Sequence, residues 1–169
     1  LDSASVRLSW NPAKSWALQV SRGHIKSPEQ LHPDEDVERT TASAIYHRDF
    51  GDARWQTTLA WGRNAPTQGE ATDAYLLESS LALSRSHTFF ARAERADKTE
   101  LFLPGDPREH ESFRAGKLTG GYIYDFATEG RFKVGLGGLV SKYAVPDELH
   151  PVYGASPTSF MVFARVKIR

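Results

Sequence analysis

The chain has 169 residues, no cysteine and a formal net charge of zero at pH 7, because 21 basic residues balance 21 acidic ones. This balance provides no overall positive field for recruiting nucleic acid, so we expect no nucleic-acid partner. The missing cysteines exclude thiolate nucleophiles, disulfides and cysteine-based zinc sites, and they are compatible with an oxidising compartment. The sequence also has no apolar run of the roughly eighteen residues that a membrane-spanning helix needs.

Along the chain, apolar and polar side chains alternate in short stretches, a pattern typical of half-buried antiparallel strands and not of helices. Residues 53–62 show it well, because Trp55, Leu59 and Trp61 share one face of the predicted strand. Trp55 and Trp61 are about 20 Å apart along that strand, close to the apolar thickness that a membrane-spanning strand must cross. In chain order, the predicted strands are residues 4–10, 15–23, 39–48, 53–62, 75–83, 89–95, 113–124, 131–143 and 160–169.

The connections between these strands alternate in length, being short after the odd-numbered strands and long after the even-numbered ones. Soluble meanders have no reason to gather long loops at one end, whereas transmembrane barrels combine short periplasmic turns with long extracellular loops. Aromatic residues concentrate near the short turns, as in the girdle at a membrane interface. The predicted girdle is Trp10, Trp16, Tyr46, Trp55, Phe89, Tyr124 and Phe132, and Trp61, Tyr75, Tyr143 and Phe160 lie nearer the long loops.

This pattern, which ends in the alternating strand 160–169, resembles bacterial outer-membrane β-barrel proteins, in particular the C-terminal portion of porin-like ones. The resemblance implies an all-β, antiparallel up-and-down transmembrane β-barrel in a bacterial cell outer membrane, acting in passive diffusion of small solutes or as a structural barrel. It implies outer-membrane lipid, lipopolysaccharide and the barrel-assembly machinery as partners, with no enzyme activity and no cofactor. Because bacterial single-chain barrels have even strand counts, we expect residues 1–169 to be one barrel domain that lacks N-terminal strands.

One face of the predicted sheet would line the barrel interior. In a small plugged barrel these side chains would be ion-paired, since unpaired charges away from water are costly. In a larger barrel they would line an aqueous lumen and set its ion preference, and their basic surplus would favour anions. By alternation, the predicted lumen-lining residues are Arg7, Gln19, His47, Glu78, Arg92, Glu94, Lys117, Arg165 and Lys167.

Histidines beside carboxylates in the long loops suit a divalent transition metal. No histidine spacing on a regular element fixes a metal geometry, so we predict no metal site and treat these histidines as solvated loop residues. Ser84, Ser86 and His87 do not form a convincing catalytic triad, because they occupy a tight turn without an orienting carboxylate nearby in the sequence. The candidate metal ligands are His24, His32, His110 and His150.

Two other functions fit parts of the pattern. A soluble lipocalin-like barrel that binds an apolar ligand would invert the faces, so that Trp55, Leu59, Leu77 and Leu81 point inward and the charged residues point to water. An outer-membrane hydrolase would keep the membrane barrel and carry its site at the extracellular rim. The direction of the apolar face therefore separates the first alternative from a membrane barrel.

Overall fold

The computed structural model describes residues 2–28, 35–98, 102, 108, 111–126 and 131–168. Strands make up most of the described chain, and a short helical segment lies between the last two of them. No helix among these residues is long and apolar enough to cross a lipid bilayer. The elements are β1 (Ala4–Ala13), β2 (Trp16–Ile25), β3 (Val37–Phe50), β4 (Ala53–Pro66), β5 (Thr72–Ala82), β6 (His87–Lys98), β7 (Phe113–Asp125), β8 (Phe132–Ala144), η1 (Asp147–Leu149), α1 (His150–Tyr153) and β9 (Thr158–Ile168).

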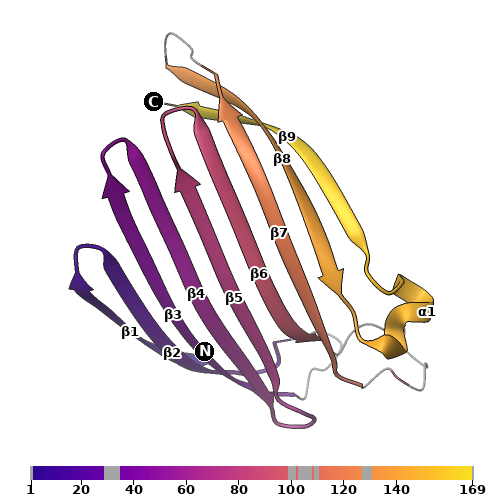
Figure 1. Cartoon of the computed structure of the whole chain (residues 1–169). Coiled ribbons are helices and arrows are strands. Elements are labelled where there is room, and N and C mark those ends of the chain that lie inside the picture. Colours follow the sequence, from indigo (N-terminus) through magenta and orange to yellow (C-terminus); the bar gives the residue numbers. More distant parts are fainter. Residues whose placement is uncertain are drawn as a thin grey trace.

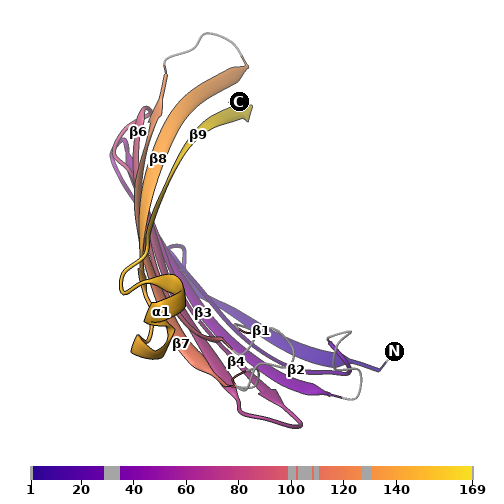
Figure 2. The same cartoon turned by 90° about the vertical axis from the view of Figure 1, so that its right-hand side faces the viewer.

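All nine strands belong to one sheet in which each strand pairs antiparallel with its sequence neighbours, in the order β1 to β9 (Figure 1). β1 and β9 are the two edges, and no pairing among the described residues joins them. Seen from the side, the sheet is curved into an open trough (Figure 2). The predicted antiparallel meander is confirmed, and the sheet formed by the described strands is not closed.

Short turns gather at one end of the sheet and most of the long connections at the other (Figure 1). The connection between β4 and β5 is shorter than predicted, because β4 continues to Pro66 and β5 begins at Thr72. Only residues 67–71 remain between them. The long connection before β9 contains η1 and α1, and Leu149 anchors it with a side chain that is almost fully buried.

Pairing register gives the two faces of the sheet different chemistry. One face carries aliphatic and aromatic side chains that stay exposed, such as Leu8 at 73% and Phe160 at 83% of their full surface. The opposite face is mainly polar, and the open hollows of the sheet, of about 640 and 720 Å³, lie on it. The polar face is therefore the concave side of the trough and the apolar face is the convex side.

The first turn differs from the prediction. β1 does not end at Trp10 but continues through Pro12 to Ala13, with a register irregularity between Trp10 and Ala13. Pro12 is tolerated because β1 is an edge strand, where a missing backbone N–H interrupts no central ladder. The turn consists of Lys14 and Ser15 only.

Candidate functional site

The predicted lumen-lining residues all lie on the concave face. Register pairs Arg7 with Ser21 and Gln19 with Ser43, and carries the same face across the sheet to the charged residues of β5 to β9. Glu78 lies opposite Arg92, and Glu94 lies opposite Lys117. The structure brings these side chains into separate groups, which correspond to the middle of β5–β8, the short-turn end of β7–β9, and the β1–β4 side.

The first group is a charged cluster in the middle of β5 to β8. Arg92 Nε donates to Glu94 Oε2 over 2.6 Å, and Arg92 Nη1 reaches Glu78 Oε2 over 3.4 Å. Lys117 Nζ lies 5.3 Å from the ring centroid of Tyr143, close enough for a cation–π contact. Arg92 is thus compensated by two carboxylates, whereas Lys117 contributes a positive charge next to an aromatic ring.

The second group surrounds a carboxylate that the sequence analysis assigned to a turn. Asp125 is the last residue of β7 and only 2% exposed. Arg165 Nη2 donates to both of its carboxylate oxygens over 2.9 and 2.8 Å. Lys167 Nζ lies 3.3 Å and Lys133 Nζ 3.6 Å from Asp125 Oδ2. We call Asp125, Lys133, Arg165 and Lys167 the Asp125 cluster, and its basic side chains outnumber its single carboxylate.

The Asp125 carboxylate can reach Arg165 only because the residue between them, Gly135, has no side chain. Register puts Gly135 between Asp125 and Arg165 on the concave face. A Cβ at Gly135 would come within 2.3 Å of Asp125 Oδ1, so any other residue would force the carboxylate aside. Asp125 and Lys133 were missed, although both continue the alternation that identified Lys117 and Arg165.

The β1–β4 side of the concave face contains the third group and is less charged. Gln19 Nε2 donates to Ser9 Oγ over 3.3 Å, and the hydroxyls of Ser21 and Thr41 lie 2.7 Å apart. Arg7 and His47 are exposed, and the structure does not bring them into contact with the charged cluster of β5–β8. The predicted lumen residues therefore share a face but do not form one cluster.

Basic side chains outnumber acidic ones on the concave face of the described strands. The carboxylates of this face are Asp49, Glu78, Glu94 and Asp125, and each has a basic partner. The basic residues of this face are Arg7, Arg39, Arg54, Arg92, Lys98, Lys117, Lys133, Arg165 and Lys167.

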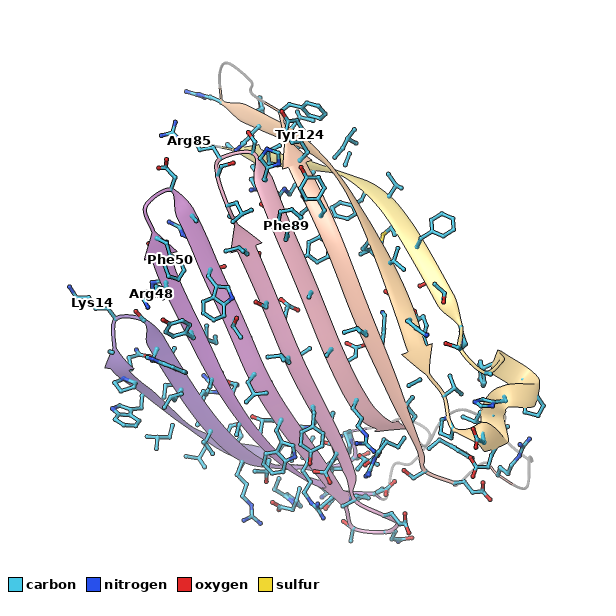
Figure 3. All side chains as sticks on the ribbon, viewed as in Figure 1. Lys14, Arg48, Phe50, Arg85, Phe89 and Tyr124 are labelled. Carbon is cyan, nitrogen blue, oxygen red and sulfur yellow. The ribbon has the colours of Figure 1, made fainter. Side chains whose placement is uncertain are left out.

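The residues of the predicted girdle all lie on the convex face by register. Near the short turns, the Tyr46 ring lies 4.9 Å from Trp16 and 5.5 Å from Trp55, centroid to centroid. Figure 3 shows Phe89 and Tyr124 at the same end of β6 and β7. Of the aromatic residues predicted near the long connections, Tyr143 does not lie on the convex face. Its position along β8 is as predicted, but alternation places it on the concave face, opposite Lys117.

The convex face becomes charged near the long connections, where the strands leave the apolar band. Arg63 Nη1 donates to Asp73 Oδ2 over 3.0 Å, and Arg114 Nε donates to Asp97 Oδ1 over 2.7 Å. Arg22 pairs with Glu38 in the same belt. We refer to these paired residues as the outer ionic belt.

The candidate metal ligands do not converge in the described part of the chain. His24 contacts Glu38 through Nδ1 and Asp36 through Nε2, so its nitrogens point to different carboxylates. His150 Nε2 lies 3.0 Å from the Val145 carbonyl oxygen. No group of His, Asp and Glu among the described residues could hold a metal ion. His32 and His110 lie outside the described residues.

The serine and histidine residues of the β5–β6 turn make structural contacts. Ser84 Oγ accepts a hydrogen bond from the Ser86 backbone N–H over 3.2 Å. His87 Nδ1 lies 2.7 Å from the Tyr122 hydroxyl, and the His87 ring lies against Tyr124. These residues are part of the girdle end of the sheet, away from the rim where the hydrolase alternative requires a site.

Comparison with protein-family models gives no match, and neither does comparison with curated proteins. Solved structures of outer-membrane proteins do match. The chain superposes on an anion-selective porin from Comamonas acidovorans with a TM-score of 0.60 at 15% identity, over 96% of this chain and 48% of that one. It superposes on OmpT, an outer-membrane protein of Vibrio cholerae, with a TM-score of 0.51 at 10% identity, over 98% and 56%.

A bacterial polysaccharide outer-membrane secretin gives a TM-score of 0.52 at 11% identity, over 99% of this chain and 56% of that one. The chain thus spans about half the length of the structures it matches. At these identities the similarity establishes the fold alone. The chain has the fold of part of a porin-like outer-membrane β-barrel, built as a nine-stranded antiparallel meander that is not closed.

Proposed function

We propose that this chain forms about half of the wall of an outer-membrane barrel that lets small solutes diffuse through an aqueous pore. The observation that carries the proposal is the separation of the two faces over all nine strands, with mainly apolar side chains on the convex side and mainly charged or polar side chains on the concave side. This separation suits lipid outside and water inside. The soluble lipocalin-like alternative needs the opposite arrangement, with Trp55 and Leu77 inside.

Closure of the barrel requires further strands. A sheet edge in hydrocarbon leaves backbone N–H and C=O groups unpaired, at a cost of several kcal/mol each. β1 and β9 both run toward the short-turn end, so joining them directly would make a parallel pair. Joining β9 of one copy to β1 of a second copy gives the same parallel pair. We infer that an odd number of additional strands, outside residues 1–169, closes the barrel.

The size of the complete barrel favours an open lumen. If nine strands are about half of the wall, the barrel has roughly 16 to 18 strands, and barrels of that size leave an aqueous channel. The ion pairs of Arg92 with Glu78 and Glu94 are then charges on a hydrated wall and not the plug of a small barrel. The basic surplus of the concave face makes anions the favoured ions, as the name of the matching Comamonas acidovorans porin says of that protein.

The orientation follows from the two ends of the sheet. The girdle would lie at the periplasmic interface and the long connections at the cell surface. The outer ionic belt, with Arg22, Arg63 and Arg114, then stands at the height of the lipopolysaccharide headgroups, whose phosphates suit guanidinium donors. Outer-membrane lipid and lipopolysaccharide are therefore the proposed partners of the convex face.

Conductance measures the proposed function directly. The complete protein, purified from outer membranes, is reconstituted in planar lipid bilayers in KCl, and the current is recorded before and after a salt gradient is applied. We expect stepwise ohmic conductance and a reversal potential that indicates a preference for chloride. Replacement of Lys117 by Glu should move the reversal potential toward potassium, whereas Lys142→Glu, next to Lys117 in space but on the convex face, should leave it nearly unchanged. Absence of any conductance would contradict the proposal.

A further inference from the structure

The concave face is not polar throughout. Between the charged cluster of β5–β8 and the Asp125 cluster lies a patch of apolar side chains, which we call the apolar island: Phe90, Ile123, Leu139, Met161 and Phe163. Phe90 and Phe163 are its aromatic members, with ring centroids 6.4 Å apart. Met161 is half exposed. Apolar surface facing a water-filled lumen is costly unless something covers it, so such a patch marks a binding surface.

The two rings come close to the sheet backbone because glycines make room for them. A Cβ at Gly121 would come within 2.2 Å of Phe90 Cζ, and a Cβ at Gly137 within 2.5 Å of Phe163 Cζ. Each ring therefore occupies the space above a glycine in a neighbouring strand. The result is an aromatic floor under one part of the hollow of about 720 Å³, which the charged cluster of β5–β8 also lines. This volume is in the range of roughly 300–1,000 Å³ typical of small-molecule sites.

The guanidinium of Arg165 bounds one end of the island. Arg165 lines the same hollow and is one register step of two residues from Phe163. Its Nη2 is held by Asp125, but its buried Nε has no hydrogen-bond partner among the described residues. Lys133 and Lys167 leave the Asp125 cluster with positive charge in excess, which favours an anionic acceptor.

The other end of the island is bounded by hydroxyl groups. Thr119, Ser141 and Ser159 form the next row on the concave face, and the hydroxyls of Thr119 and Ser141 lie 2.8 Å apart. Rows on one face are about 7 Å apart along a strand. The Arg165 row, the Phe163 row and the Phe90 row therefore place a cationic donor and two successive apolar rows within about 14 Å.

We propose that this hollow binds small aromatic carboxylates, with the carboxylate beside the partly exposed Arg165 guanidinium and the ring lying over Phe163 and Phe90. The inference deepens the proposed pore function and rests on it, because the ligand reaches the hollow through a water-filled lumen. Aromatic rings prefer offset or edge-to-face contacts, which the tilted pair Phe90 and Phe163 offers. A neutral sugar would leave hydroxyl groups against Leu139 and Met161 without partners, so sugars fit this floor poorly.

Binding is measured by isothermal titration calorimetry on the complete barrel in detergent micelles, with 3-phenylpropionate as the probe. The matched compounds are 3-phenylpropan-1-ol, which lacks the charge, and propionate, which lacks the ring. We expect saturable binding of 3-phenylpropionate at one site per chain, and binding at least about tenfold weaker for each matched compound, since each loses one of the two contacts. Equal binding of all three compounds, or no binding of 3-phenylpropionate, would overturn the inference.

Variants on one strand locate the site. Phe163→Ala removes a ring of the floor, and Val162→Ala removes an apolar side chain of the same strand that is 76% exposed on the convex face. Loss of one aromatic contact should weaken 3-phenylpropionate binding about five- to tenfold for Phe163→Ala, whereas Val162→Ala should leave it unchanged. Arg165→Lys keeps the positive charge opposite Asp125 but removes the planar guanidinium, and we expect it to weaken binding of the acid and not of the alcohol. Unchanged binding in both Phe163→Ala and Arg165→Lys would overturn the assignment.

Calorimetry and conductance separate this inference from the proposed pore. Conductance without 3-phenylpropionate binding would overturn the site and leave the pore standing. Binding without conductance would support the site and contradict the pore. Variants that retain the conductance of the unmodified protein are folded, so a loss of binding in them reports on the hollow itself.

Discussion

The convex and concave faces of this sheet use the same backbone but different interactions. On the convex face, side chains such as Leu77 have no polar partner and stabilise the sheet only if hydrocarbon surrounds them. One residue further, Glu78 on the concave face pairs with Arg92. The comparison shows that each strand faces two solvents at once, so the same substitution should destabilise the barrel to different extents at neighbouring residues.

The largest loss of folding stability is expected from a substitution at the buried carboxylate of the concave face. Asp125→Asn removes the carboxylate that holds Arg165, Lys167 and Lys133 together. Breaking a buried ion pair by removing one partner costs about 3–5 kcal/mol. The matched variant is Asp49→Asn, which breaks an exposed pair with Arg54 on the same face and should cost about 1 kcal/mol or less. Urea titrations of folding into lipid vesicles measure both, and equal losses would show that burial of Asp125 does not matter.

The second largest loss of folding stability is expected when a charged side chain is placed on the lipid-facing side of the sheet. Leu77→Arg, in the middle of β5 on the convex face, should cost about 2–4 kcal/mol. Leu77 is more informative than Leu81, because Leu81 lies opposite Trp55 and Phe89 in the girdle. Glu78→Arg on the concave face should cost about 1 kcal/mol, from repulsion with Arg92 across the strand pair. The same vesicle titrations apply, and a larger loss at Glu78 than at Leu77 would contradict the assignment of the faces.

Two adjacent glycines test the packing of the apolar island. Gly121→Ala on the concave face places a methyl group in the Phe90 ring and against the Gly138 carbonyl, so we expect a loss of about 1–3 kcal/mol from overpacking. Gly120→Ala on the convex face meets nothing within 4 Å and should be neutral or slightly stabilising. Far-ultraviolet circular dichroism during thermal unfolding in micelles compares them. A destabilised Gly120→Ala and a neutral Gly121→Ala would reverse the description of the floor.

The strands and their faces could be predicted from the sequence because alternation is a local signal with a period of two. Strand ends were predicted less well. Residues 11–13 and 63–66 were expected in connections, but β1 continues through Pro12 and β4 continues to Pro66. Proline is tolerated at both places, because Pro12 lies in an edge strand and Pro66 at a strand end. Both strands are therefore longer than expected.

The contents of the concave face were harder to predict, because they depend on partners far apart in the sequence. Asp125 and Arg165 are 40 residues apart, and only the register of β7, β8 and β9 brings them together. The apolar island was not predicted, because apolar side chains at concave positions depart from the alternation of apolar and polar faces. Phe90 and Phe163 occupy such positions, but Gly121 and Gly137, which accommodate them, belong to other strands.

The smallest loss of folding stability is expected from a substitution in the girdle, which tests whether the girdle rings stabilise one another. Tyr46→Leu removes the ring that lies between Trp16 and Trp55 and keeps an apolar side chain on the convex face. Aromatic pairs contribute about 0.5–1.5 kcal/mol beyond the area that they bury, so we expect a loss of about 1 kcal/mol. Tyr75→Leu is the control, since Tyr75 is also on the convex face, is half exposed and has no ring contact with a described residue. It loses only the preference of tyrosine for the membrane interface. Vesicle titrations that give equal losses would mean that the girdle stabilises the barrel by its depth in the membrane alone, whereas a larger loss at Tyr46 would show that its ring contacts contribute as well.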